Sequence, residues 1–263
     1  MGQDSPFCAR NAVAGKRHLF ALLFFAISFS SAAQYQESLM FGFKVGAGWS
    51  SISGLPAILV PEDFYSGYTF ESRGLIRPAA SLFVTYRLPD SPIGLEGRLT
   101  YSQHSVNLVY SDIMNFTYTC KFHYHYIGGG AYIRAYILSG LNVAVGMRMG
   151  INLTPENIDY VSNSHEIEWP DGIIPDSDAY TRDELRNVIK GLNTSELSLL
   201  VGYEFVNGFS IDLGYSHGLN DVIETFANRH NFGNPINNPS AVWIAVGYAI
   251  SVDAPPRRHR RGR

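Results

Sequence analysis

The segment of residues 41–50 alternates strictly between two kinds of side chain. Its odd positions are apolar and its even positions are glycine or polar: Phe41, Phe43, Val45, Ala47 and Trp49 oppose Gly42, Lys44, Gly46, Gly48 and Ser50. Successive side chains of a β-strand point to opposite faces, so a period of two indicates a strand with one apolar and one polar face. The pattern recurs in segments long enough to cross a bilayer, which takes about 9–11 residues per tilted strand.

Eight segments of the chain carry this pattern. They are residues 40–50, 78–87, 93–102, 121–137, 141–152, 195–205, 209–218 and 241–250. The links after the second, fourth and sixth segments are short and turn-like, at residues 88–92, 139–140 and 206–208. The other links are longer, at residues 51–73, 106–119, 153–194 and 219–240. Alternation of short and long links is typical of outer-membrane barrels, whose tight turns face the periplasm.

The N-terminus predicts export of the chain. Lys16 and Arg17 precede an apolar run over residues 19–29, and small residues follow up to Ala33. This order is typical of a cleaved signal peptide, so we expect residues 1–33 to be removed after Ala33. The alternative is an uncleaved anchor, but the apolar run is shorter than the roughly 20 residues of a spanning helix.

Together these patterns predict an all-β protein: residues 34–252 form one eight-stranded antiparallel up-and-down transmembrane β-barrel in the outer membrane. The barrel must close, because lipid cannot satisfy the backbone groups of an open sheet edge. An even number of strands leaves both termini on the periplasmic side. Cys120 is the only cysteine after Ala33, so no intramolecular disulfide can form. A soluble lipocalin-like barrel is the alternative, and it would need an apolar lumen.

Several of these strands resemble those of the PorT-like, porin-family outer-membrane β-barrel proteins. The resemblance is carried by residues 41–50, 98–104, 199–205 and 211–219. It implies an outer-membrane location and an eight-stranded barrel, and it brings no catalytic residues with it. The chain differs from this pattern by continuing past its last strand. Residues 253–263 contain five arginines and two prolines, and we expect a disordered basic tail in the periplasm.

If the apolar faces meet lipid, a set of charged side chains points into the lumen: Lys44, Glu96, Arg98, Arg148, Glu196, Glu204 and Asp212. The interior of an eight-stranded barrel is just wide enough to be filled by its own side chains. Because buried charges need partners, we expect these residues to form a structural network of ion pairs and hydrogen bonds. The alternative is a narrow ion path, as in a small porin.

His123 and His125 lie two residues apart in the fourth segment and invite a metal-site hypothesis. A metal site normally needs three or four ligands, and the spacing offers no third one. We therefore expect the pair to form hydrogen bonds in the lumen. The acidic link of residues 153–194 includes Asp171, Asp176 and Asp178, but their spacing does not match a calcium-binding loop.

Two serine–histidine pairs raise the alternative of a lipid-modifying hydrolase. They are Ser216 with His217 and Ser102 with His104. Such pairs are common by chance, and an activated serine also needs a positioned base and a group that orients it. We therefore predict no catalytic, cofactor-binding or metal-binding residues, and no enzyme activity.

The expected surroundings of the chain are outer-membrane lipid and a partner protein of the cell envelope. The long extracellular links, one aromatic (residues 51–73) and one acidic (residues 153–194), or the basic tail would contact that partner. Nucleic acid is not expected in that compartment. The sequence therefore predicts a structural or interaction role; the alternative is an accessory component of an outer-membrane secretion or transport assembly.

Overall fold

The computed structural model describes residues 38–60, 62–138, 140–164, 177–226 and 232–253. The expected signal peptide, the tail beyond Asp253, and the acidic residues Asp171 and Asp176 lie outside the described residues. No helix in these ranges is long and apolar enough to cross a membrane.

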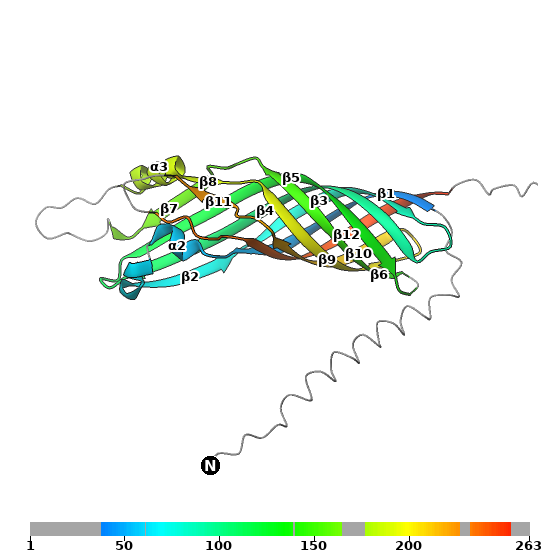
Figure 1. The fold of residues 1–263 in the computed structure, drawn as a ribbon, viewed down its shortest axis with the longest axis horizontal. Coiled ribbons are helices and arrows are strands. Elements are labelled where there is room, and N and C mark those ends of the chain that lie inside the picture. The colour runs from blue at the N-terminus through cyan, green and yellow to red at the C-terminus, as the bar shows by residue number, and fades with distance from the viewer. Residues whose placement is uncertain (1–37, 61, 139, 165–176, 227–231, 254–263) are drawn as a thin grey trace, which may run out of the picture.

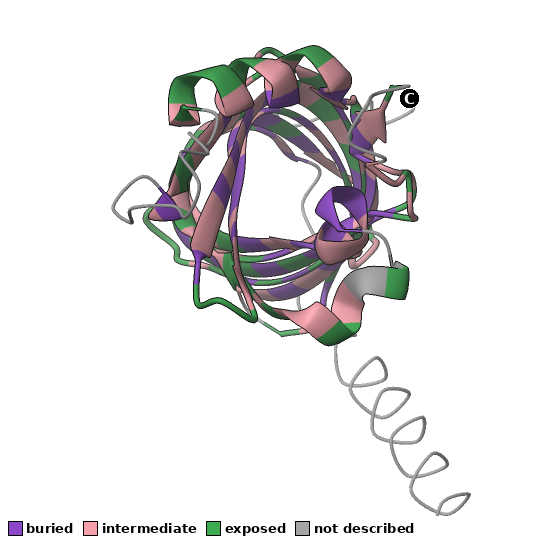
Figure 2. Ribbon diagram, turned by 90° about the vertical axis from the view of Figure 1, so that its left-hand side faces the viewer, coloured by how far each residue is buried: buried purple, intermediate pink, exposed green. Residues whose placement is uncertain are grey.

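Eight long antiparallel strands form a closed ring. They are β1 (Ser38–Ile52), β3 (Ile76–Arg87), β4 (Ile93–Asp112), β5 (Thr117–Tyr136), β6 (Leu141–Asn152), β9 (Thr194–Glu204), β10 (Phe209–Gly218) and β12 (Pro239–Asp253). Each pairs with its neighbours along the chain, and β1 also pairs with β12, which closes the barrel (Figures 1 and 2). Each of the eight strands overlaps one of the eight predicted segments, so the predicted fold class is confirmed.

The barrel strands expose their apolar face and bury their polar one. In β10, Ile211 and Leu213 are exposed, whereas the alternate residues Ser210 and Asp212 are buried. The same outward arrangement of apolar residues recurs in β1, β6, β9 and β12. A continuous apolar outer band with a polar interior is the arrangement expected of a strand barrel surrounded by lipid.

Glycines with positive φ form the tight turns at one end of the barrel. Gly140 lies between β5 and β6 with φ 85°, and Gly208 lies between β9 and β10 with φ 87°. The turn between β3 and β4 contains Asp90 with φ 54°. These turns occupy the three predicted short links. They also lie at the end of the barrel where β1 begins and β12 ends, because Ser38 pairs both with Arg87, at the end of β3, and with Asp253.

The opposite end of the barrel carries a folded cap (Figure 1). We use this name for the outer ends of β4 and β5 together with α2 (Leu55–Leu59), the 3-10 helix η2 (Glu62–Gly67), β2 (Tyr68–Gly74), β7 (Ile158–Ser162), α3 (Asp178–Val188), β8 (Ile189–Gly191) and β11 (Ile223–Thr225). Strand β2 pairs with β4, and β7 pairs with β5. The cap therefore continues the barrel wall beyond the apolar band.

The expectation of a long loop over residues 106–119 is wrong. Strands β4 and β5 each have 20 residues and pair from Ile93–Ala135 to Ser111–Thr117, so only a short turn joins them. Asp112 Oδ1 stabilises this turn by accepting hydrogen bonds from the backbone N–H groups of Met114 and Phe116. The strands extend because Val106 and Leu108 pack in the core of the cap rather than against lipid.

Candidate functional site

A layer of paired charges crosses the lumen near the middle of β1. Lys44 Nζ donates to Asp212 Oδ2 at 2.5 Å, and Arg98 Nη2 lies 3.4 Å from the same oxygen. Arg98 Nε also donates to Glu96 Oε1 at 2.9 Å. All four side chains are at most 4% exposed. The charges are therefore held by one another, which is how buried ions survive in a protein interior.

Arg134 joins this layer, although it is not among the predicted lumen residues. Its side chain is fully buried, and its Nη2 donates to Glu96 Oε2 at 2.7 Å. Its Nη1 donates to Asn142 Oδ1 and lies 3.9 Å from Glu204 Oε1. The alternation of β5 could have identified it, because Ile133 is exposed and the next residue must face inward. Arg134 therefore links carboxylates that come from β4 and β9.

Glu204 lies nearer the rim that carries the tight turns. It forms an ion pair with Arg87, and Tyr136 Oη donates to its Oε1 at 3.4 Å. The guanidinium of Arg87 lies 4.0 Å from the centre of the Tyr136 ring, a cation–π contact. The charged layer thus extends toward this rim.

A second cluster lies on the cap side of the first. Arg148 Nη2 donates to Glu196 Oε2 at 2.5 Å, and Glu196 is 1% exposed. Its other oxygen accepts from Thr194 Oγ1 at 3.2 Å and lies 3.5 Å from His104 Nε2. The structure thus divides the seven predicted lumen residues into two groups. Arg148 and Glu196 form this second cluster, and the other five belong to the first: Lys44, Glu96, Arg98, Glu204 and Asp212.

Glycines make room for the ion pairs. A Cβ atom on Gly247 would lie 2.5 Å from Lys44 Cγ, and one on Gly202 would lie 2.5 Å from Asp212 Oδ1. Gly247 sits on β12, the strand between those of Lys44 and Asp212, and Gly202 sits on β9, beside Asp212 on the other side of β10. Side chains at these two positions would displace the network.

Aromatic and apolar side chains occupy space between the charges. Lys44 Nζ lies 4.6 Å from the centre of the Phe83 ring, and the Arg98 guanidinium lies 4.9 Å from that of Tyr132. Leu200 interrupts the polar face of β9 and packs with Tyr132 and Ala144, with Trp243 against them. The lumen at this level is therefore filled by side chains rather than open.

In the cap, β5 turns its aromatic residues inward and its polar residues outward, the reverse of the arrangement in the apolar band. This corrects the expectation for His123 and His125. Phe122 and Tyr124 are fully buried in the core of the cap, and the two histidines lie on the opposite, half-buried face. His125 Nδ1 lies 2.7 Å from Tyr101 Oη, so this histidine does not form its hydrogen bond in the lumen. His123 Nδ1 lies 3.4 Å from Arg77 Nη2. Among the described residues, no group of three histidine, cysteine or acidic side chains is placed to hold a metal ion.

The two serine–histidine pairs are not arranged alike. Ser216 is buried on the inner face of β10, whereas the next residue, His217, is on the outer face with Nδ1 3.2 Å from Ser240 Oγ. Ser102 and His104 both face inward, but His104 Nδ1 has no hydrogen-bond partner in the described part of the chain. Among the described contacts, neither predicted pair holds its own serine hydroxyl against its own histidine.

The long links fold onto the cap. Tyr65 and Phe70 of the aromatic link lie 4.9 Å apart, centre to centre, and pack against the apolar core of the cap. In the acidic link, Lys190 Nζ donates to Glu156 Oε1 at 2.6 Å. The same link forms the helix α3, which is capped by Ser177, whose side chain accepts a hydrogen bond from the Tyr180 N–H.

A closed antiparallel barrel with an apolar outer band and a charge-paired interior defines a transmembrane β-barrel. The family described as "Outer membrane protein beta-barrel domain" matches residues 32–224. The chain belongs to this family, and it is a protein of the outer membrane surrounded by outer-membrane lipid.

Solved structures of other outer-membrane proteins are similar in fold. Ail, the attachment invasion locus protein of Yersinia pestis, is 9% identical, with 82% of this chain and 100% of that chain covered and a TM-score of 0.36. OprG from Pseudomonas aeruginosa is 11% identical, with 82% and 98% covered and a TM-score of 0.40. Neisserial surface protein A is 12% identical, with 80% and 96% covered and a TM-score of 0.35. No curated protein matches the chain.

Proposed function

We propose that this protein is a closed, non-catalytic barrel that anchors its cap at the cell surface as a platform for a partner. The observation that carries the proposal is the layer of ion pairs across the lumen, in which Lys44, Arg98 and Arg134 all lie within 4 Å of Asp212. A pore needs a continuous wet path, and this layer occupies the path with mutually paired side chains.

Opening a path through the layer would break several buried ion pairs at once. Removing one partner of such a pair typically costs about 3–5 kcal/mol, because the other charge is left buried and unpaired. The glycines behind Lys44 and Asp212 fix the pair in place, since the side chains approach the backbone at Gly247 and Gly202. These contacts support a structural role for the lumen residues rather than conduction.

The cap supports an interaction role. It has its own buried core, which includes Leu55 and Ile58 of α2 with Phe122 of β5. Segments held on a rigid scaffold often carry binding function. The helix α3 presents charged side chains at the surface, among them exposed Asp183 and half-buried Arg182. A partner would therefore meet a folded surface.

Single-channel recording in planar bilayers tests the closed lumen. We expect the purified mature chain to give no stable open steps. The double variant Lys44→Ala/Asp212→Ala, which removes two members of the layer without leaving either charge unpaired, is the matched comparison and should conduct more readily. Stable open steps from the wild-type chain at neutral pH would contradict the proposal.

A narrower form of this proposal is that the protein is an accessory component of an envelope secretion or transport assembly. The PorT-like resemblance of the strands supports this form. Chemical cross-linking in membranes followed by purification tests this narrower form. Recovery of the protein in one defined complex, lost when the surface of α3 is altered by Arg182→Glu, would support it. Recovery only as a heat-modifiable monomer would leave a purely structural barrel.

A further inference from the structure

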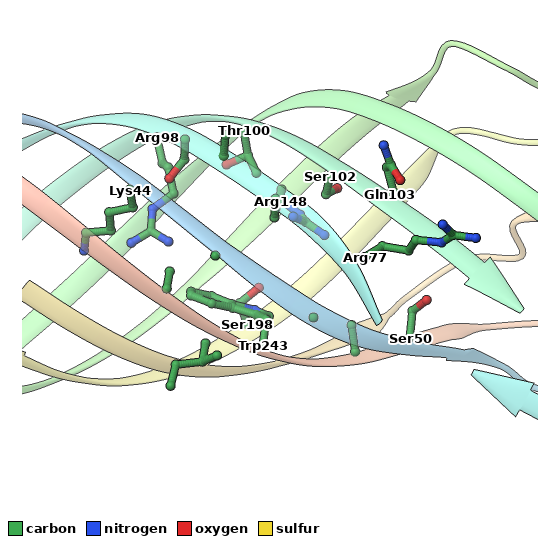
Figure 3. A pocket seen from close by; sticks show the side chains of 18 of the residues that line it. Lys44, Ser50, Arg77, Arg98, Thr100, Ser102, Gln103, Arg148, Ser198 and Trp243 are labelled. Carbon is green, nitrogen blue, oxygen red and sulfur yellow. The ribbon is translucent and has the colours of Figure 1, made fainter. Parts of the chain in front are cut away.

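A cavity of about 60 Å³ lies inside the barrel, on the cap side of the Lys44 layer. Figure 3 shows Lys44 and Arg98 at one end of it, Arg77 and Gln103 at the other, and Arg148 between them. Its walls are made of small residues from β1, β3 and β12, among them Gly46 and Gly48, which is why the space is not filled. A site for one water needs about 10–15 Å³, so the cavity has room for several waters or for a small ion.

The lining of this cavity is strongly cationic. It includes four basic side chains, Lys44, Arg77, Arg98 and Arg148, and among its described residues there is no aspartate or glutamate. Three of these cations are paired with carboxylates that lie behind the wall. In the described part of the chain Arg77 has no carboxylate partner, and its contact there is a 3.4 Å approach of Nη2 to His123 Nδ1. A positive charge without a counter-charge at the wall of a cavity favours uptake of an anion.

Unpaired polar atoms on the same wall point to a ligand. Arg77 Nε, Thr100 Oγ1 and His104 Nδ1 are buried and have no hydrogen-bond partner among the described residues, and all three side chains line the cavity. Thr100 is 9% exposed and His104 is 3% exposed. Buried polar atoms are nearly always hydrogen-bonded, so an exception within a cavity indicates a bound species. The Arg77 N–H and the Thr100 hydroxyl are donors, which suits an acceptor such as an anion.

We propose that this cavity binds a small inorganic anion of the size of chloride, with Arg77 and Thr100 as its donors and Lys44, Arg98 and Arg148 supplying the positive field. The bound anion offsets the charge of Arg77 and stabilises the closed barrel. This inference is independent of conduction.

Thermal unfolding of the detergent-solubilised mature chain, followed by heat-modifiable gel migration, tests the site. Sodium chloride is compared with sodium gluconate at equal ionic strength, because gluconate is too large for the cavity. We expect the midpoint to rise by a few degrees in chloride, since a ligand that binds the native state alone stabilises it. Arg77→Gln and Thr100→Val should each reduce this difference, and Arg73→Gln, on the exposed Glu71–Arg73 pair, should keep it.

Bromide locates the ion directly. In crystals grown with sodium bromide, we expect an anomalous peak at the bromine edge within hydrogen-bond distance of Thr100 Oγ1 and Arg77. Peaks confined to the protein surface would overturn the proposal. An equal chloride effect in the wild type, Arg77→Gln and Thr100→Val would also overturn it, because the anion would then act elsewhere.

Discussion

Lys44 on β1 and Asp212 on β10 form a 2.5 Å ion pair although 168 positions separate them in the chain. Strand β12 lies between their strands, and Gly247 of β12 leaves the space through which the lysine reaches the aspartate. The pair exists only once the barrel has closed, because β1 and β12 are its first and last strands. The Lys44–Asp212 ion pair therefore indicates that the barrel is closed.

Breaking this pair should destabilise the barrel strongly. Asp212→Ala leaves the Lys44 ammonium buried, and we expect a loss of about 3–5 kcal/mol in the free energy of unfolding. Lys44→Met/Asp212→Leu, which removes both charges, should recover much of that loss. Urea unfolding in lipid vesicles, followed by tryptophan fluorescence, measures both. A loss in the double variant as large as in the single one would show that the charge pairing is not the cause.

Gly247 should tolerate no side chain. Gly247→Ala places a Cβ atom 2.5 Å from Lys44 Cγ and 2.8 Å from the Phe43 carbonyl oxygen. We expect a cost of about 1–3 kcal/mol in the same unfolding assay, as for other overpacked interiors. Gly97→Ala is the matched control, because the nearest atom, Val84 Cγ1, would be at an ordinary 3.5 Å. Similar losses from both variants would argue against a steric origin.

Cys120 should react only when the cap opens. Its thiol is fully buried in the cap, and burial raises its pKa to about 12. Between pH 7 and pH 9 the native thiol stays protonated, whereas an unfolded cysteine, with a pKa near 8.5, becomes increasingly reactive. Maleimide labelling of the folded mature chain should therefore be slow and nearly independent of pH. Fast labelling that rises with pH, as expected of Met114→Cys in a Cys120→Ala background, would contradict this.

The cap and the barrel should lose structure separately. Ile58 of α2 is fully buried in the core of the cap, and Ile58→Ala should cost about 2–5 kcal/mol there. We expect the thiol of Cys120 to be labelled faster in Ile58→Ala, because the cap opens more often. The barrel should remain heat-modifiable, because Ile58 is not part of the lumen network. Ile113→Ala, at a position that is 81% exposed, is the control and should leave the labelling rate unchanged. Loss of heat modifiability in Ile58→Ala would mean that the two parts fold as one unit.

The cap should lie outside the cell. In a Cys120→Ala background, Met114→Cys marks the tip of the β4–β5 hairpin and Val206→Cys marks the turn between β9 and β10; both positions are exposed. A membrane-impermeant maleimide applied to intact cells should label Met114→Cys alone. Val206→Cys should react only after the outer membrane is made permeable. The opposite pattern would reverse the orientation.

The strands could be predicted from sequence because lipid imposes one local condition on each of them. Every spanning segment must show apolar residues at alternate positions, and β10 illustrates this with Ile211 and Leu213 outward and Asp212 inward. The same alternation was enough to place Lys44, Glu96 and Arg98 inside. It also applied to Arg134, which lies between exposed Ile133 and Ala135 in a stretch that also contains tyrosines.

What the sequence by itself determined is the number of strands and, within the apolar band, the face of each that meets lipid. The tertiary structure alone decided which charges meet, since Lys44 reaches Asp212 through ring closure and strand stagger, which no local spacing encodes. It also decided the orientation of β5 in the cap, where Phe122 and Tyr124 turn inward and His123 outward. Aromatic side chains are stable both against lipid and in a protein core, so the sequence of β5 does not show which of its faces is buried. The packing of α2 and its neighbours against Phe122 and Tyr124 decides this.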